Sequence, residues 1–170
     1  MKSSYNHKNI KLHQFSNHYL QRNDESFKIL KQVYNGNFPY TSDFYPLLIQ
    51  NFERLYKGVC YELQKLHPKN IKFKISDYSA GHHFSAFARE VNKYIYLSGS
   101  KEGYYTILNQ ITKLESQYTP SRYEDNYDIE EFRAIFRRYE IQMDRLYTGL
   151  HKEISKVKYE KDDLKDLEIW

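Results

Sequence analysis

Residues 129–157 read IEEFRAIFRRYEIQMDRLYTGLHKEISKV and carry the most regular apolar pattern of the chain. Apolar side chains return every three or four residues, at Ile129, Phe132, Phe136, Tyr139, Met143, Leu146, Leu150, Ile154 and Val157. This spacing is close to a heptad and places the apolar side chains on one face of a helix. It predicts a long helix that packs along a seam. A seam of this length favours a second copy or another partner along its distal half, although a protruding helix end would give the same pattern.

Four other segments have helical periodicity. We expect helices over Lys11–Asn35, from Ser42 or Asp43 to Leu66, over Ala80–Tyr96 and over Lys101–Tyr118. Residues that end helices follow them, at Gly36, His67-Pro68, Leu97–Ser100 and Thr119-Pro120. Lys69–Ser79 alternates apolar residues with lysines, but a lone strand has no partner, so we expect an extended loop there. The sequence therefore predicts an all-α, up-and-down bundle of about five helices over residues 10–157, followed by a charged C-terminal tail over residues 158–170.

Composition sets the class of protein. A chain of 170 residues is long enough for one domain with a substantial core, and its 18 Tyr and 10 Phe predict an aromatic-rich one. A single cysteine, Cys60, excludes an intrachain disulfide and a cysteine metal cluster, which fits a reducing compartment. We expect no targeting signal or membrane anchor, because the first residues lack an apolar stretch and the longest apolar run, Phe44–Ile49, is too short to span a bilayer. We expect a cytoplasmic protein.

The charges are unevenly placed along the chain. Residues 1–75 carry 12 basic and 5 acidic side chains, whereas residues 76–170 carry 14 basic and 17 acidic ones. A basic front half would attract a phosphate-bearing ligand, but the same charges spread over several helices make an ordinary solvated surface. We favour the ordinary surface, so charge supports a nucleic-acid ligand only weakly.

Three polar motifs interrupt the helical pattern. They are Gln50–Lys57 (QNFERLYK), Gly81–Phe84 (GHHF) and Ser121–Asp125 (SRYED). In this order and at these separations the chain resembles the HEPN domains, helical bundles that bind nucleotides or RNA and often read Q-x-x-E-K-x-x-K, G-H-D-L and S-R-Y-P-D. The resemblance covers about residues 42–150. It implies the same bundle and a nucleotide or RNA ligand.

The first two motifs each have an alternative explanation. Glu53 and Lys57 form an i,i+4 pair that would stabilise any exposed helix, whereas the resemblance makes Lys57 a contact for an anionic ligand. His82 could satisfy a backbone group at a helix start, or it could titrate near neutrality and face the ligand, as the resemblance implies. His83 stands where the family has Asp, which leaves the role of that position open. Adjacent histidines do not chelate one metal on a helix, so we expect no metal and no cofactor.

The third motif also fits a helix start. Ser121 and Glu124 match a capping box, and Asp125 and Asp128 suit a helix N-terminus. Capping does not need Arg122 or Tyr123. An arginine grips phosphate bidentately and a tyrosine stacks on a base, so we assign both to the ligand site. Glu124 replaces the proline of the family.

A ribonuclease is the main alternative function. Many HEPN proteins cut RNA with an R-x(4–6)-H motif, and Arg145 to His151 has that spacing. On a continuous helix residues six apart face about 120° away from each other. The two would converge only if Gly149 bent the helix or if a second subunit contributed. Such an enzyme would be a metal-independent endoribonuclease.

The sequence thus favours a non-catalytic protein. We expect a nucleotide or RNA end to be held by Lys57, His82, Arg122 and Tyr123, and we expect a homodimer. By resemblance, the protein would work beside a separate nucleotidyltransferase in a toxin–antitoxin or defence module. The alternatives are the ribonuclease that uses Arg145 and His151, and a helical adaptor that binds protein through its seam.

Overall fold

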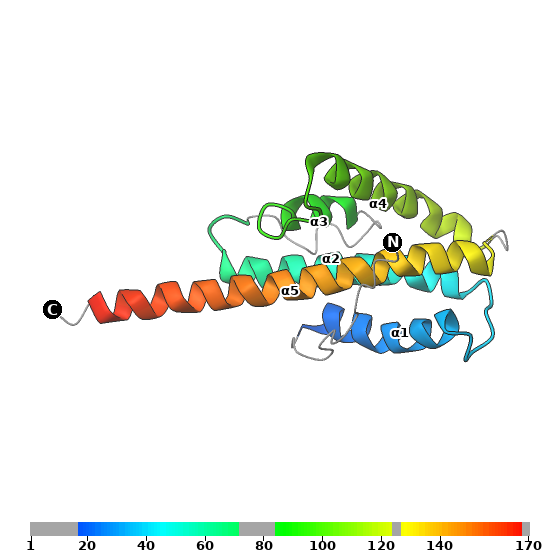
Figure 1. Ribbon diagram of the computed structural model, residues 1–170, viewed down its shortest axis with the longest axis horizontal. Coiled ribbons are helices and arrows are strands. Elements are labelled where there is room, and N and C mark those ends of the chain that lie inside the picture. The colour runs from blue at the N-terminus through cyan, green and yellow to red at the C-terminus, as the bar shows by residue number, and fades with distance from the viewer. Residues whose placement is uncertain (1–16, 72–83, 124–126, 168–170) are drawn as a thin grey trace, which may run out of the picture.

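The computed structural model describes residues 17–71, 84–123 and 127–167, and these ranges contain five helices and no strand. The helices are α1 (His18–Tyr34), α2 (Phe44–Leu66), α3 (Phe84–Val91), α4 (Lys101–Ser121) and α5 (Ile129–Leu167). In Figure 1, α1 and α4 run in one direction along the molecule and α2 and α5 run in the other. The expected all-α bundle is confirmed.

Helix α2 is the centre of the bundle. It contacts each of the other four helices, while α4 rests on α2 and α3 more than on its neighbour in sequence, α5. Figure 1 shows α4 inclined to α5, approaching it at one end and diverging from it at the other. The long helices therefore do not form a closed bundle, and the wedge between α4 and α5 lies over α2.

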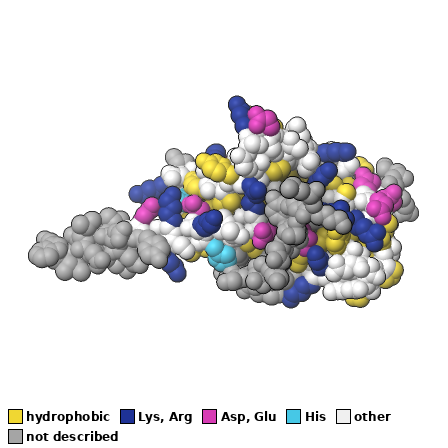
Figure 2. Space-filling model, in the orientation of Figure 1, with side chains coloured by type: hydrophobic (Ala, Val, Ile, Leu, Met, Phe, Trp, Pro, Cys, Tyr) yellow, Lys and Arg dark blue, Asp and Glu magenta, His cyan; other side chains and the backbone are white. Residues whose placement is uncertain are grey.

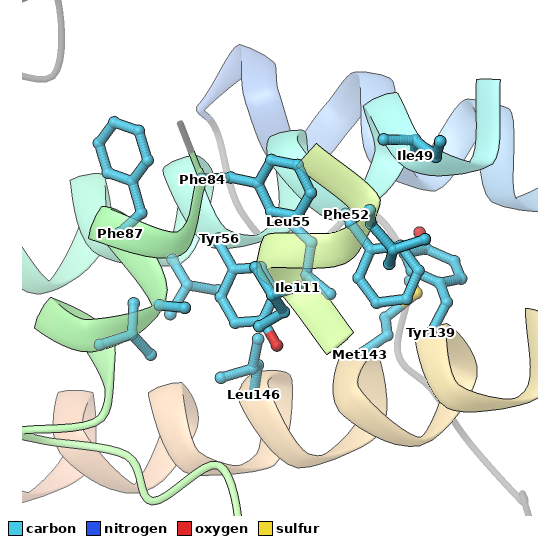
Figure 3. Close-up of a cluster of buried hydrophobic side chains, with 14 of the residues drawn as sticks. Ile49, Phe52, Leu55, Tyr56, Phe84, Phe87, Ile111, Tyr139, Met143 and Leu146 are labelled. Carbon is cyan, nitrogen blue, oxygen red and sulfur yellow. The ribbon is translucent and has the colours of Figure 1, made fainter. Parts of the chain in front are cut away.

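The core is as aromatic as the composition predicts. Its largest fully buried side chains are Tyr45, Tyr56, Tyr139, Phe84, Phe87, Phe132 and Phe136. Figure 3 shows side chains from α2, α3, α4 and α5 gathered in one cluster, with Phe52 and Tyr56 near its middle. The predicted seam of α5 is buried from Phe132 to Leu150, and Ile154 and Val157 are half-buried.

Helix α1 ends where the sequence predicts. Gly36 has φ of 78°, in the left-handed region that glycine tolerates, and the amide of Asn37 donates to the carbonyl of Gln32. The helix starts later than expected, at His18, because the side chain of Asn17 accepts a hydrogen bond from the amide of Leu20 at 3.0 Å. The expected start near Lys11 lies outside the described residues.

Helices α3 and α4 differ from the expected bounds. The α3 helix ends at Val91 and not near Tyr96, because the chain turns to bury both Ile95 and Leu97, and the side chain of Asn92 accepts from the amide of Leu97. The start expected at Ala80 lies outside the described residues. Helix α4 continues through Pro120 to Ser121, so Thr119-Pro120 does not end it.

Asp128, not Ser121, caps the last helix. Ser121 is the last residue of α4, and its hydroxyl donates to the carbonyl of Tyr118. The carboxylate of Asp128 accepts from the amide of Glu131 at 2.9 Å. The capping-box interpretation of Ser121 is therefore wrong. Helix α5 continues through the expected tail as far as Leu167.

A buried polar network joins α1, α2 and α5. The hydroxyl of Tyr139 donates to Oδ1 of Asn23 at 2.6 Å, and Nδ2 of Asn23 donates to the hydroxyl of Tyr147 at 3.2 Å. Tyr147 in turn donates to the carboxylate of Asp24 at 2.5 Å. Asn51 of α2 donates to Tyr139 and to the backbone carbonyl of Asn23. All five residues are buried, so these hydrogen bonds fix the positions of α1, α2 and α5 relative to one another.

Candidate functional site

The first and third motifs meet in one pocket. Residues from the first half of α2 and the end of α4 line a hollow of about 220 Å³, and they are Asp43, Pro46, Leu47, Gln50, Tyr118 and Arg122. Gln50 belongs to the first motif and Arg122 to the third. The fold therefore brings together two of the three motifs that the sequence singled out.

Arg122 lies close to two aromatic rings. Its Cζ lies 5.8 Å from the centroid of Tyr118 and 5.8 Å from that of Tyr123, within the range of cation–π attraction. Tyr118 is buried, whereas Tyr123 is 78 % exposed. In the parts of the chain that the structure describes, Arg122 forms no ion pair. Its guanidinium is thus oriented by the rings and remains open to an anion.

Arg54 is a second cation close to this pocket. It donates to Oε1 of Gln50 at 2.9 Å, to Oδ1 of Asn51 at 3.2 Å and to the hydroxyl of Ser26 at 3.0 Å. Burial, and next the charge of Arg22, lower the pKa of Arg54. Because the oxygen of Gln50 is occupied, its amide NH₂ is the group that can donate into the pocket.

Sequence reasoning did not assign Gln50 or Arg54 to the site. Both lie in the first motif, four residues apart and therefore on one helix face. That spacing was the signal that could have found them. Arg54 donates to Ser26 of α1, and Gln50 lines a pocket with Tyr118 of α4. Only the fold brings these two helices close to α2.

Lys57 lies in the core and does not line this pocket. Its side chain is 7 % exposed, its Nζ is bonded to the carboxylate of Glu53, and it lies 5.7 Å over the ring of Phe87. These contacts favour the i,i+4 pair over the ligand contact for this residue. A buried and paired ammonium is also costly to separate from its carboxylate.

Residues 81–83 of the second motif, which include His82 and His83, lie outside the described residues, whereas its last residue, Phe84, is the first residue of α3. The first turn of α3 is held by α4. The amide of Ser85 donates to the carboxylate of Glu115, and the Ser85 hydroxyl donates to the same carboxylate at 3.0 Å. Glu115 is on α4, seven residues before Arg122, which directly follows the end of that helix. Helix α4 therefore connects the chain that follows the second motif to the third motif.

The candidate nuclease pair does not converge within one chain. Helix α5 runs unbroken through Gly149, and a Cβ at this position would lie 2.3 Å from Cγ2 of Ile95. Glycine is thus required here for close packing and does not mark a bend. Arg145 is exposed and lines a depression of about 400 Å³ with Tyr94, Tyr96 and others, whereas His151 is half-buried and does not line it.

The charge on the face shown in Figure 2 is mixed, which favours the ordinary interpretation of the basic front half. Figure 2 shows Lys and Arg side chains spread over the visible face and interspersed with acidic ones. The described residues contain no group of three or more His, Cys, Asp or Glu side chains that could hold a metal ion. Among the described helices, none combines the length and apolar character needed to cross a bilayer.

Comparisons with models of known protein families, with curated proteins and with solved structures gave no match to this chain. The site must therefore be interpreted from its own geometry. That geometry is an arginine in cation–π contact with two tyrosines, beside an amide donor and a second, half-buried arginine.

Proposed function

We propose that this chain is a non-catalytic, HEPN-type protein that binds a nucleotide or an RNA end in the pocket of Arg122. The guanidinium of Arg122 would hold the phosphate, and the amide of Gln50 would donate to the phosphate or the ribose. The exposed ring of Tyr123 would stack on the base. One observation carries the proposal: Gln50 and Arg122, about 70 residues apart in sequence, line the same pocket.

The carboxylate of Asp43 sets a limit on the ligand. It lines the same pocket as Arg122 and would repel a ligand with several phosphates. A monophosphate, such as a nucleoside monophosphate or the 5′-phosphate of a single RNA strand, fits this balance of charge better than a triphosphate. His82 remains part of the proposal as a second contact for the ligand, and Lys57 is assigned to the core.

Replacing Arg122 by glutamine should weaken binding of a short 5′-phosphorylated RNA by about ten- to a hundredfold, because a charge-assisted hydrogen bond is lost. Fluorescence anisotropy at fixed salt measures the change. The matched control is Arg89→Gln, which removes an exposed arginine of α3 that does not line the pocket. Equal affinity of wild type and Arg122→Gln would refute the site.

The same samples test the ribonuclease alternative. We expect the RNA to be recovered intact after incubation, because Arg145 and His151 do not meet within one chain. Cleavage that disappears in His151→Ala would establish the nuclease. That result would also imply that a second subunit supplies one of the two residues.

Helix α5 supports the proposed homodimer. Nε2 of His67, at the end of α2, lies 3.3 Å from the carboxylate of Glu153. From there α5 continues to Leu167, about 20 Å further. Figure 1 shows this end of α5 reaching beyond the other helices. Half-buried Ile154 and Val157 lie on it at seam spacing, and a second α5 would cover them.

We expect the wild type to elute with twice its chain mass of 20.7 kDa. The double variant Ile154→Glu/Val157→Glu should be monomeric, because charges at a seam position are not tolerated in a coiled coil. Light scattering after size exclusion measures the mass. Ser155→Glu adds a charge at an exposed position of the same turn and should stay dimeric. A monomeric wild type would contradict the dimer.

The resemblance alone supports a nucleotidyltransferase as partner. In that arrangement the chain would present an RNA end or nucleotide to a separate enzyme of a toxin–antitoxin or defence module. Co-purification of the tagged chain with such an enzyme, reduced in Arg122→Gln if the ligand bridges the two proteins, tests this part of the proposal.

A further inference from the structure

The wedge between α4 and α5 encloses a second cavity, distinct from the pocket of Arg122. It has a volume of about 270 Å³ and is floored by Phe52 and Tyr56 of α2. Leu114 and Ile111 of α4 form one wall, and Ile135 and Ile141 of α5 form the other. Figure 3 shows Ile111 next to Tyr56 at this place in the core. The cavity lies where α4 and α5 are not packed closely on each other.

The walls are apolar and partly open to solvent. Ile135 is half-buried and Ile141 is 41 % exposed, although both are large aliphatic side chains beside the core. An apolar cavity of about 150 Å³ is enough to bind benzene. The larger volume here has room for a ring system or a short alkyl chain.

Two cations stand on the facing walls. Lys113 of α4 and Arg138 of α5 both line the cavity, and neither forms an ion pair or hydrogen bond with any residue in the described ranges. Among the described residues that line the cavity, Glu131 is the only acidic one. Lys113, Arg138 and Glu131 together carry a net charge of about +1. One negative charge on a ligand would therefore neutralise the site. The hydroxyl of Tyr45, which donates to Gln117 at 3.2 Å, adds a neutral polar group at the same site.

We propose that this cavity binds a small apolar carboxylic acid. Its hydrocarbon part would lie between Ile111, Leu114 and Ile135, and its carboxylate would lie between Lys113 and Arg138. Removing the exposed aliphatic surfaces of Ile135 and Ile141 from water supplies the affinity, and the two cations supply the preference for an anion.

The size of the cavity excludes a helix as its occupant. A ten-residue helix with its side chains occupies on the order of 1,000 Å³, several times the available volume. A ligand with several negative charges would be repelled by Glu131. A small acid with a single negative charge satisfies both the volume limit and the charge limit.

Decanoate is the probe, and calorimetry with the full chain is the measurement. We expect one decanoate per chain, and weaker binding of decanol and of decylammonium. Arg138→Gln should weaken decanoate about tenfold and leave decanol within about twofold. Arg133→Gln is the control, since Arg133 is on the same helix and pairs with Glu130 outside the cavity.

A cavity-filling variant gives an independent check. Ile135→Trp should abolish binding of both decanoate and decanol, because the indole occupies the space. Circular dichroism shows whether this variant folds, and Arg138→Gln, which changes only an exposed side chain, tests the proposal if it does not. Absence of heat with decanoate would overturn the proposal, as would equal binding of decanoate and decylammonium. The nucleotide site is unaffected by either result, because it shares no lining residue with this cavity.

Discussion

Raising the pH from about 10 to about 12 should unfold this protein in one cooperative step. Tyr56, Tyr139 and Tyr147 are buried, and burial raises the pKa of each hydroxyl well above the ordinary value of about 10. In Tyr147 the neighbouring charge of Asp24 raises the pKa further. These groups keep their protons in the folded state and lose them near pH 10 in the unfolded chain.

The sign follows from proton linkage. Above pH 10 the unfolded state binds fewer protons than the folded state, so the stability of the fold decreases as the pH rises. Below pH 10 these tyrosines are protonated in both states, and their full contribution to stability is present. Three such groups cost about 4 kcal/mol per pH unit together. A rise of two pH units therefore lowers the free energy of unfolding by about 8 kcal/mol, which is comparable with the whole stability of an ordinary domain. Tyr40, whose pKa burial raises to about 12, adds to the effect.

Circular dichroism and tyrosinate absorbance, recorded together against pH, measure this transition. We expect Tyr56→Phe to move its midpoint to higher pH, because one titrating group is removed while its ring still fills the core. Tyr105→Phe, at a position that is 52 % exposed, should leave the midpoint in place. A protein that remains helical while all 18 tyrosines ionise near pH 10 would contradict the burial of these hydroxyls.

Asn23→Leu should destabilise the protein by about 2–6 kcal/mol. Leucine is similar in size to asparagine, so the main effect is the loss of the hydrogen bonds that Asn23 makes. Tyr139 loses the acceptor at 2.6 Å, and Tyr147 loses the donor at 3.2 Å. Each buried group left without its bond costs about 1–3 kcal/mol. Urea denaturation compares the variant with Asn109→Leu, which changes an exposed residue of α4. Equal stability of the two variants would show that the network contributes little.

Much of the fold was predictable because the signals are local. The seam of α5 and the stripe of α2 follow from a period of 3.6 residues, and Gly36 ends α1 because of its own backbone freedom. The early end of α3 was not predictable in this way. It depends on Ile95 and Leu97 being buried by a turn against other parts of the bundle.

The candidate site was only partly predictable for the same reason. Motif matching selected Arg122 and Tyr123, but it also selected Lys57, whose ammonium lies in the core beside Glu53 and Phe87. Motif spacing does not tell which face of α2 points inward at each position. Gln50 and Arg54 matter because α1 and α4 lie against α2, and that is tertiary information.

Side-chain NMR of Arg122 and Gln50 during a titration with adenosine monophosphate tests the central claim most directly. The Nε–Hε signal of Arg122 and the amide NH₂ signals of Gln50 should shift together and saturate with one dissociation constant, while the Nε–Hε signal of Arg89 stays in place. Signals of Arg122 and Gln50 that do not move with this nucleotide, or with a 5′-phosphorylated RNA, would contradict the proposed pocket.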